Sequence, residues 1–221
     1  MKEKHFTILR RHMVEVIGIT TELASDELGK ETLDERVMDV MGTVPRHLFV
    51  PPELLLHAYE NAPLPIGFGK TISQPFIVAV MTDLLDPQPD SVVLEVGTGL
   101  GYQTSILAEL AREVWSVEIV EELATDAEAR LRRFGYDNVG IRVGDGSKGW
   151  PEHAPFDRIL VSAAADLVPP ALVEQLKPGG RMVLPMGQPD QQKLAVVEKD
   201  AGNYIHIRDL MPVRFTLLET V

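Results

Sequence analysis

Short apolar runs alternate with amphipathic stretches along the chain from residue 91 onward. The runs predict the strands of a buried sheet, at residues 92–96, 114–118, 139–143, 158–162 and 181–185. The stretches between them carry apolar residues at helical spacing and predict helices, at residues 103–112, 121–133 and 169–176. Strands that alternate with helices are typical of βαβ units, and the sheet that such units form is parallel.

The last two apolar segments break this alternation. Residues 193–198 and 204–209 flank the turn sequence Asp200-Ala201-Gly202-Asn203, which predicts a hairpin and therefore antiparallel strands at one end of the sheet. The predicted fold class is α/β: a doubly wound, Rossmann-like sheet, mostly parallel, with an antiparallel C-terminal hairpin and an N-terminal region of helices and loops before it.

That N-terminal region shows mainly helical patterns. Apolar spacing predicts four helices, at residues 5–19, 32–41, 53–59 and 76–85. The second opens on Thr32-Leu33-Asp34-Glu35, which fits a capping box. Residues 61–75 are rich in proline and glycine and predict an ordered loop. We divide the chain into residues 1–75 and a sheet domain, residues 76–221, and expect one compact unit.

Composition removes several classes of function. The net charge is -12, from 21 basic and 33 acidic residues among 221, so the phosphate attraction behind most nucleic-acid binding is missing. The chain has no cysteine, which excludes disulfides and cysteine-ligated metals. No apolar run approaches the ~18 residues of a membrane span, and the first residues lack a signal-peptide pattern. We expect a cytoplasmic monomer without metal, membrane or nucleic-acid partners.

A glycine-rich turn carries the first candidate chemistry. Gly97, Gly99 and Gly101 follow the strand at 92–96 and precede a predicted helix. Glycines let the backbone approach a ligand closely, and a helix N-terminus offers unpaired N–H groups. The dinucleotide fingerprint is G-x-G-x-x-G, whereas the spacing here is G-x-G-x-G with Glu95 two positions before it. This variant resembles the first motif of the class I S-adenosylmethionine-dependent methyltransferases.

Acidic residues at two further strand ends support the same cofactor. Glu118 ends the next strand and can accept hydrogen bonds from both ribose hydroxyls. Asp145 follows the third strand and can accept from an adenine amino group, while Gly146 offers a nearby N–H. Glu95 can orient the glycine turn or meet the amino acid part of the cofactor. Together they favour S-adenosylmethionine over NAD.

The loop before the sheet domain gives a more specific resemblance. Leu64-Pro65-Ile66-Gly67 and Thr71-Ile72-Ser73-Gln74-Pro75 resemble the active-site loop of the protein-L-isoaspartate (D-aspartate) O-methyltransferases, which generic methyltransferases lack. Val44-Pro45-Arg46-His47-Leu48-Phe49-Val50-Pro51 resembles the N-terminal signature of that family. The cofactor loop, residues 94–104, fits as well. The resemblance covers about residues 40–217.

The resemblance implies repair of damaged protein. The family methylates the free α-carboxyl of L-isoaspartyl residues, with the β-carboxyl of D-aspartyl residues as a possible second acceptor, and the ester returns to aspartate through a succinimide. It implies a catalytic role for Ser73, a substrate loop of Leu64, Pro65, Ile66, Gly67 and Lys70, and a set of cofactor-binding residues. These are Thr71, Ile72, Ser73, Glu95, Gly97, Thr98, Gly99, Gly101, Glu118, Asp145 and Gly146.

Two positions depart from the family pattern. Lys70 stands where the family usually has glutamine, and Ser147 stands where it has a bulky residue. Four other functions compete with this interpretation. A small-molecule O-methyltransferase would act on a phenol or free acid, a non-catalytic protein would bind the cofactor without turnover, and a dehydrogenase would bind NAD. A nucleic-acid methyltransferase is disfavoured by the net charge and by the absence of an Asn-Pro-Pro-Tyr or Asp-Pro-Pro-Tyr motif. The glycine spacing argues against the dehydrogenase.

Overall fold

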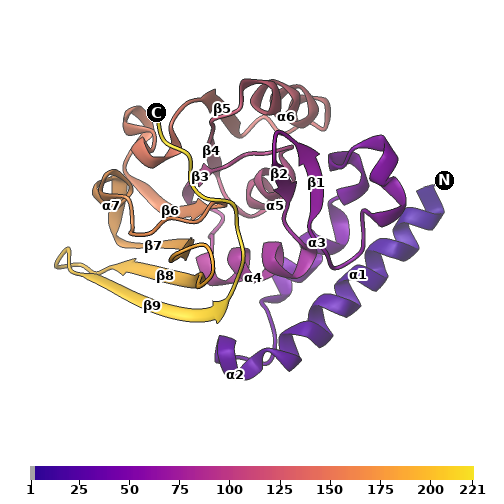
Figure 1. Cartoon of the computed structure of the whole chain (residues 1–221), viewed down its shortest axis with the longest axis horizontal. Helices are drawn as coiled ribbons and strands as arrows, with labels where there is room; N and C mark the ends of the chain where they lie inside the picture. Colours follow the sequence, from indigo (N-terminus) through magenta and orange to yellow (C-terminus); the bar gives the residue numbers. More distant parts are fainter. Residues whose placement is uncertain (1–2) are drawn as a thin grey trace.

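A seven-stranded sheet forms the centre of the computed structural model, which describes residues 3–221 (Figure 1). Its strand order is β5-β4-β3-β6-β7-β8-β9. The strands are β3 (Val92–Val96), β4 (Glu113–Glu118), β5 (Val139–Val143), β6 (Phe156–Val161), β7 (Leu176–Met186), β8 (Lys193–Lys199) and β9 (Ile205–Pro212). Strands β3 to β7 run parallel, and β8 and β9 are antiparallel additions at one edge. The predicted fold class is confirmed.

Helices cover the two faces of the sheet unequally. Val93 belongs to a core with α4 (Pro75–Leu85), α5 (Tyr102–Leu110) and α6 (Glu121–Arg133). The next residue, Leu94, points to the opposite face, because side chains alternate along a strand. That face is covered by the short helix α7 (Pro170–Gln175) and by the ring of Trp150 beside two 3-10 turns, at Gly146–Lys148 and Pro151–His153.

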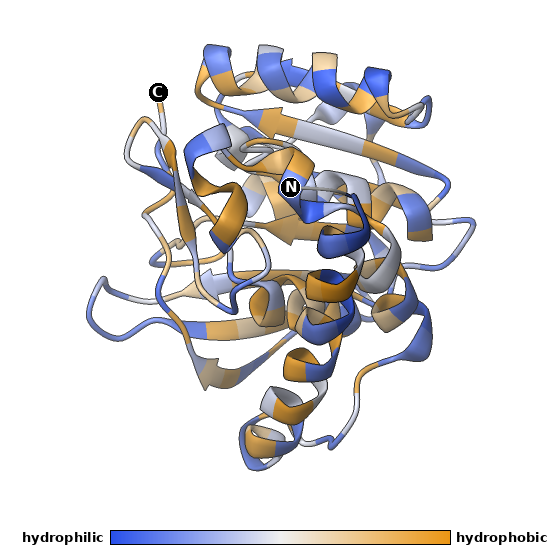
Figure 2. Cartoon of the chain, turned by 90° about the vertical axis from the view of Figure 1, so that its right-hand side faces the viewer, coloured by the Kyte–Doolittle hydropathy of each residue, from blue (hydrophilic) through white to orange (hydrophobic). Residues whose placement is uncertain are grey.

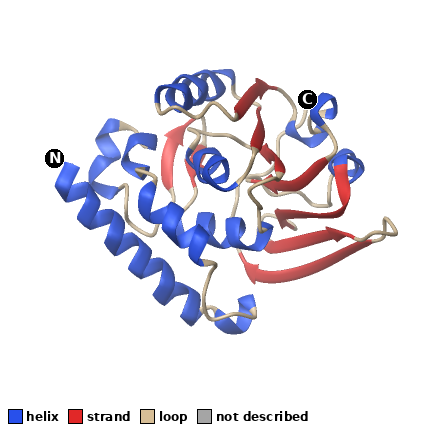
Figure 3. Ribbon diagram, turned by 180° about the vertical axis from the view of Figure 1, so that it is seen from behind, coloured by secondary structure: helices blue, strands red, loops and turns tan. Residues whose placement is uncertain are grey.

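The N-terminal helices complete the first of these cores. They are α1 (Glu3–Leu23), α2 (Ser25–Leu28) and α3 (Glu35–Thr43), followed by 3-10 helices at Arg46–Phe49 and Pro52–His57. Helix α1 is amphipathic (Figure 2) and buries Phe6, Met13 and Ile17 in the core that α4 and α5 share. Seen from behind, α1 lies along the outer side of the other N-terminal helices (Figure 3).

Three local predictions need correction. Helix α3 begins at Glu35, and its N-cap is Asp34, two residues after the Thr32 that the capping box implies. The Asp34 side chain accepts a hydrogen bond from the Arg36 backbone N–H at 2.8 Å. A carboxylate near the N-terminal dipole makes the stronger cap. The helix expected at 53–59 is a 3-10 helix that buries no residue, so no apolar face favours a longer α-helix.

The third correction concerns the loop at 61–75. Its middle is a hairpin of β1 (Leu64–Gly67) and β2 (Lys70–Ile72), with Leu64 opposite Ile72. Phe68 and Gly69 form the turn with positive φ angles of 53° and 68°. Strands this short and interrupted by Pro65 show no alternating pattern, so the sequence did not reveal them. The hairpin lies beside the sheet at the carboxyl ends of the strands (Figure 1).

The structure also bears on the membrane question. Within residues 3–221, no helix combines the length and the apolar character that a membrane span requires.

Candidate active site

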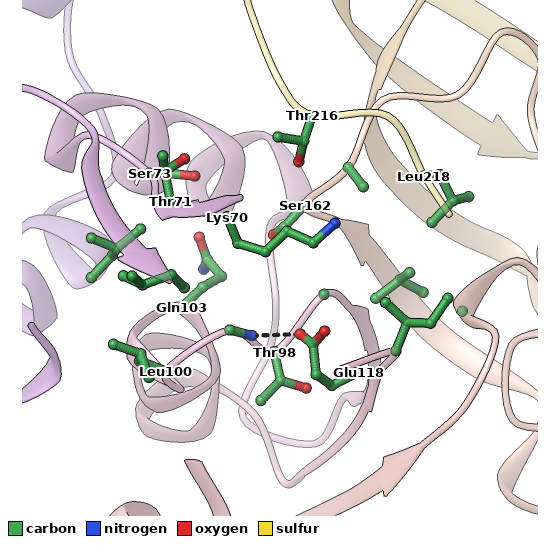
Figure 4. A pocket seen from close by; sticks show the side chains of 18 of the residues that line it. Lys70, Thr71, Ser73, Thr98, Leu100, Gln103, Glu118, Ser162, Thr216 and Leu218 are labelled. Atoms are coloured by element: carbon green, nitrogen blue, oxygen red, sulfur yellow. Dashed lines mark hydrogen bonds between the residues drawn. The ribbon is translucent and has the colours of Figure 1, made fainter. Parts of the chain in front are cut away.

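A cleft opens where the carboxyl ends of β3, β4 and β6 meet, between the β1–β2 hairpin and the C-terminal segment (Figure 4). The cleft contains about 850 Å³ of space between its walls, part of which is open to solvent. An open α/β sheet binds its ligands at this position. Predicted residues that line it are Ile66, Lys70, Thr71, Ile72, Ser73, Gly97, Thr98, Gly99, Glu118 and Gly146.

The glycine turn is built for close approach. Gly97, Gly99 and Gly101 have φ angles of 93°, 55° and 88°, which side chains rarely adopt. A Cβ on Gly101 would lie 3.1 Å from Leu131 of α6, and one on Gly99 would lie 3.3 Å from Ile66 of the hairpin. The glycines therefore bring the backbone against both neighbours. Gly101 serves this packing and does not itself line the cleft.

Glu118 closes the floor of the cleft. Its side chain is buried, and its carboxylate accepts hydrogen bonds from the backbone N–H of Gly99 at 2.8 Å and of Val120 at 3.0 Å. The first of these bonds is drawn in Figure 4. The carboxylate is thus fixed at the end of β4 beside the glycine turn, where the hydroxyls of a ribose can reach it.

Asp145 stands beside the cleft, and only its neighbour Gly146 lines it. The Asp145 carboxylate accepts from Ser147 at 2.9 Å (N–H) and 2.6 Å (Oγ), and from the Val221 N–H at 3.3 Å. Burial acts to raise the pKa of Asp145, but these hydrogen bonds outweigh burial and hold the pKa below its usual value. A Cβ on Gly146 would lie 2.2 Å from Val96, so glycine is required there.

Glu95 lies beneath the glycine turn and does not line the cleft. Its Oε2 accepts hydrogen bonds from Thr104 of α5 at 2.5 Å and from Ser116 of β4 at 2.6 Å. Thr98, which does line the cleft, lies 2.5 Å from Ser116. Because the Ser116 hydroxyl donates to Glu95, the Thr98 hydroxyl donates to Ser116. Full burial raises the pKa of Glu95 to about 8. The side chain supports the turn from below.

Ser73 and Thr71 stand where the cleft meets a second hollow. That hollow is lined by Pro63, Gln74, Phe76, Ile77 and residues 211–216. Four hydroxyl-bearing residues line both spaces: Thr71, Ser73, Ser162 and Thr216. Figure 4 shows Thr71 and Ser73 on the hairpin side and Thr216 on the C-terminal segment. A group held in the second hollow therefore meets a ligand in the cleft beside Ser73.

The substrate-loop residues have unlike environments. Leu64 and Ile66 are buried, and Ile66 packs against the glycine turn at Gly99, while Pro65 and Gly67 are exposed. Lys70 extends across the cleft, and its Nζ pairs with Glu219 of the C-terminal segment at 2.5 Å. The ammonium of Lys70 is thus bound within the chain.

The C-terminal segment was missed as part of the site. Residues 216–219 close one side of the cleft, with Thr216 and Leu218 facing it. Backbone hydrogen bonds of 2.8 Å on both sides of Ala164 hold the segment to the loop after β6. Ser162, at the end of β6, and Gln103, in the first turn of α5, were missed as well. Strand-end position would have indicated Ser162, but no sequence signal indicates the C-terminal segment.

The donor set bears on the kind of ligand. Within the described part of the chain, no three His, Cys, Asp or Glu side chains gather as metal ligands would. The cleft instead offers a glycine turn, a fixed carboxylate on Glu118 and apolar surface from Ile66 and Leu100. The fixed carboxylate beside the glycine turn fits the ribose of a nucleoside cofactor, and the apolar side chains fit the face of its base. The fold and the cleft define a Rossmann-like, S-adenosylmethionine-dependent methyltransferase.

Comparisons with known proteins specify the family. The model of the protein-L-isoaspartate(D-aspartate) O-methyltransferase (PCMT) family matches residues 21–220, and the chain belongs to this family. The chain is 58% identical over 219 residues to protein-L-isoaspartate O-methyltransferase 1 of Polaromonas sp. strain JS666, covering 99% of this chain and 93% of that one. It is 56% identical over 210 residues to a Syntrophobacter fumaroxidans protein-L-isoaspartate O-methyltransferase 2, covering 95% and 85%.

Solved structures agree. A protein-L-isoaspartate O-methyltransferase superposes on 94% of this chain with a TM-score of 0.80 and 25% identity, although this chain spans only 65% of the length of that one. A Plasmodium falciparum structure, described as a putative protein-L-isoaspartate O-methyltransferase in complex with S-adenosyl-L-homocysteine, has a TM-score of 0.74 and 26% identity. The superposition covers 85% of this chain and 92% of the Plasmodium falciparum chain.

Proposed function

We propose that this enzyme transfers a methyl group from S-adenosylmethionine to the free α-carboxyl of L-isoaspartyl residues in damaged proteins. The observation that carries the proposal is the junction at Ser73, where the cofactor cleft meets a second hollow. The hollow is open at the surface and is lined by Phe76, Met211, residues 212–214 and Phe215. Such a lining suits a peptide, because it offers apolar contacts together with the hydroxyls of Thr71, Ser73 and Thr216.

The reaction needs little acid–base chemistry from the protein. An α-carboxyl has a pKa of ~3.3–3.7, so the acceptor is an anion at neutral pH and no general base is required. The cofactor supplies an electrophilic methyl group on sulfur. One carboxylate oxygen forms a bond to that methyl carbon as the carbon–sulfur bond breaks, and S-adenosylhomocysteine leaves without proton transfer. The chain must therefore hold and desolvate the acceptor.

Ser73 is suited to hold the acceptor. It follows β2 directly and precedes Pro75, the first residue of α4, so two regular elements fix its backbone. Its hydroxyl can donate to one carboxylate oxygen and leave the other free to react. Thr71 and Thr216 offer further hydroxyls around the same junction. The cofactor would lie between the glycine turn and Glu118, with Gly146 beside its base.

The test is methyl transfer to two matched peptides, one with isoaspartate and one with normal aspartate. We expect base-labile methyl ester on the isoaspartyl peptide alone. Transfer to neither peptide, with S-adenosylhomocysteine binding shown by calorimetry, would refute the proposal and indicate another acceptor or a non-catalytic protein. A third peptide with D-aspartate decides whether its β-carboxyl is a second acceptor.

We further propose that the protein acts as a cytoplasmic monomer. One chain supplies the glycine turn, Glu118 and Ser73 that the proposed reaction uses. Sedimentation at concentrations around the working range of the assay is expected to give a mass near 24.5 kDa. A dimer mass that persists on dilution would contradict this.

A further inference from the structure

Arg46 is the largest fully buried side chain among residues 3–221, and the chemistry described so far does not use it. It lies in the 3-10 helix Arg46–Phe49, which follows Pro45. Within residues 3–221, it forms no ion pair with a carboxylate, and its Nη1 has no hydrogen-bond partner. Burying a charge without a counter-ion is costly, and burial lowers the pKa of Arg46 to about 10. A residue that served packing alone would be apolar.

The contacts of Arg46 converge on the segments that frame the active site. Its Nη2 donates to the backbone carbonyl of Ser73 at 2.7 Å, and its Nε donates to the carbonyl of Ala58 at 2.8 Å. Its Cζ lies 4.8 Å from the ring centre of Tyr102. Tyr102 is the first residue of α5, directly after the glycine turn, and it lines the cofactor cleft.

We infer that Arg46 is a positioning residue: it fixes the backbone of Ser73 relative to the cofactor turn, and so sets where the Ser73 hydroxyl meets the acceptor. A planar guanidinium can donate to two carbonyls in one plane while its face rests on an aromatic ring. A lysine has neither the fork nor the face. The β1–β2 hairpin is short, and Ser73 directly follows it. The hydrogen bond from Arg46 to the Ser73 carbonyl links this residue, through the guanidinium, to Tyr102 at the start of α5.

The inference rests on the proposed role of Ser73, and a double-mutant cycle separates the two. We expect Arg46→Lys to lower kcat at least about 30-fold, since displacement of a reacting group by ~1 Å can cost roughly a hundredfold. The dissociation constant for S-adenosylhomocysteine should change by less than about threefold. In the Ser73→Ala background, the same substitution should lower kcat by less than about threefold, because no hydroxyl remains to be misplaced.

Arg158→Lys is the matched control. Arg158 also donates to backbone carbonyls, those of Asp86 and Asp157, but it lies at the amino end of β6, away from the cleft. Its substitution should leave kcat within about twofold. An equal loss from Arg46→Lys in both backgrounds, or no loss in either, would overturn the inference. A Ser73→Ala variant with unchanged kcat would instead refute the proposed role of Ser73.

A second variant covers the case in which Arg46→Lys does not fold. Tyr102→Leu removes the ring on which the guanidinium rests and keeps an apolar side chain in place. It should lower kcat in the wild-type background and have less effect in the Ser73→Ala background. Additive losses there would likewise overturn the inference, whatever the variant does to cofactor affinity.

Discussion

At the scale of single residues, the site depends on hydroxyls and carboxylates whose positions are fixed by backbone. Ser73 is the plainest case, since it lies at the junction of two spaces and is held between β2 and α4. Glu118 is fixed by two backbone N–H groups. Glu95, by contrast, acts through Ser116 and Thr98 from below the turn.

Removing the Ser73 hydroxyl should impair the reaction and spare cofactor binding. We expect Ser73→Ala to lower kcat on an isoaspartyl peptide about a hundredfold, because the acceptor oxygen loses its alignment with the methyl group. The affinity for S-adenosylhomocysteine, measured by calorimetry, should stay within about threefold. Ser25→Ala, at the start of α2, is the control and should change neither value. An unchanged kcat for Ser73→Ala would remove Ser73 from the active site.

The raised pKa of Glu95 makes the free energy of unfolding depend on pH. Its pKa is raised by burial from 4.5 to about 8, so between these values the folded state holds a proton that the unfolded state has lost. Its contribution to stability is therefore complete below about pH 4.5 and is lost as pH rises toward 8, with a slope of up to ~1.4 kcal/mol per pH unit.

Urea unfolding from pH 5.5 to 8 measures this slope. Glu95→Gln keeps an acceptor for Ser116 and Thr104 but does not ionise, so its free energy of unfolding should fall less steeply with pH. Identical slopes for the two proteins would show that Glu95 ionises normally in the folded state.

At the scale of elements, the hairpin and the C-terminal segment face each other across the cofactor cleft. Lys70 of β2 and Glu219 join them by an ion pair, and Glu219 is more than half exposed. The C-terminal segment runs over the carboxyl ends of the strands and ends near β5 (Figure 1). A ligand in the cleft would be held in part by this closure.

Breaking the ion pair should speed release of the product. A partly exposed ion pair is worth up to ~1 kcal/mol, so Glu219→Gln should accelerate S-adenosylhomocysteine dissociation by about two- to fivefold in stopped-flow experiments. High salt should narrow the difference between variant and wild type. Lys193→Gln breaks an exposed ion pair with Asp209 on the β8–β9 hairpin and serves as the control. Equal release rates in all three proteins would show that the pair does not hold the segment closed.

At the scale of the whole molecule, the N-terminal helices and the sheet share one core. Ile17 of α1 is fully buried in the cluster that includes α4 and α5, whereas Ile19 of the same helix is 59% exposed. Because both residues are isoleucines of one helix, substituting each by alanine changes helix propensity equally, and only the Ile17 substitution also removes core packing.

Truncating Ile17 should destabilise the entire chain in one step. We expect Ile17→Ala to lower the free energy of unfolding by ~2–4 kcal/mol, with far- and near-ultraviolet circular dichroism changing together. Ile19→Ala should cost less than ~1 kcal/mol. Separate transitions by the two probes would show that α1 unfolds independently of the sheet.

The sequence by itself determined which strands and helices follow one another along the sheet domain, and where the glycine turn lies. Apolar runs predict strands because a strand buried on both faces needs apolar side chains on each of them. The glycine turn could be predicted because it depends on neighbouring residues alone, and Gly97, Gly99 and Gly101 all have positive φ angles. The acidic strand ends could be predicted for the same reason: parallel strands carry their carboxyl ends to one edge.

Only the tertiary structure decided what surrounds that edge. The β1–β2 hairpin depends on packing against the cofactor turn, the closure by residues 216–219 joins segments far apart in the sequence, and the bond from Arg46 to Ser73 spans 27 positions. Likewise, of the two roles that the sequence left open for Glu95, burial favours support of the glycine turn over contact with the ligand. Local pattern carries no information about such long-range contacts, because they arise from the packing of elements that the pattern specifies one at a time.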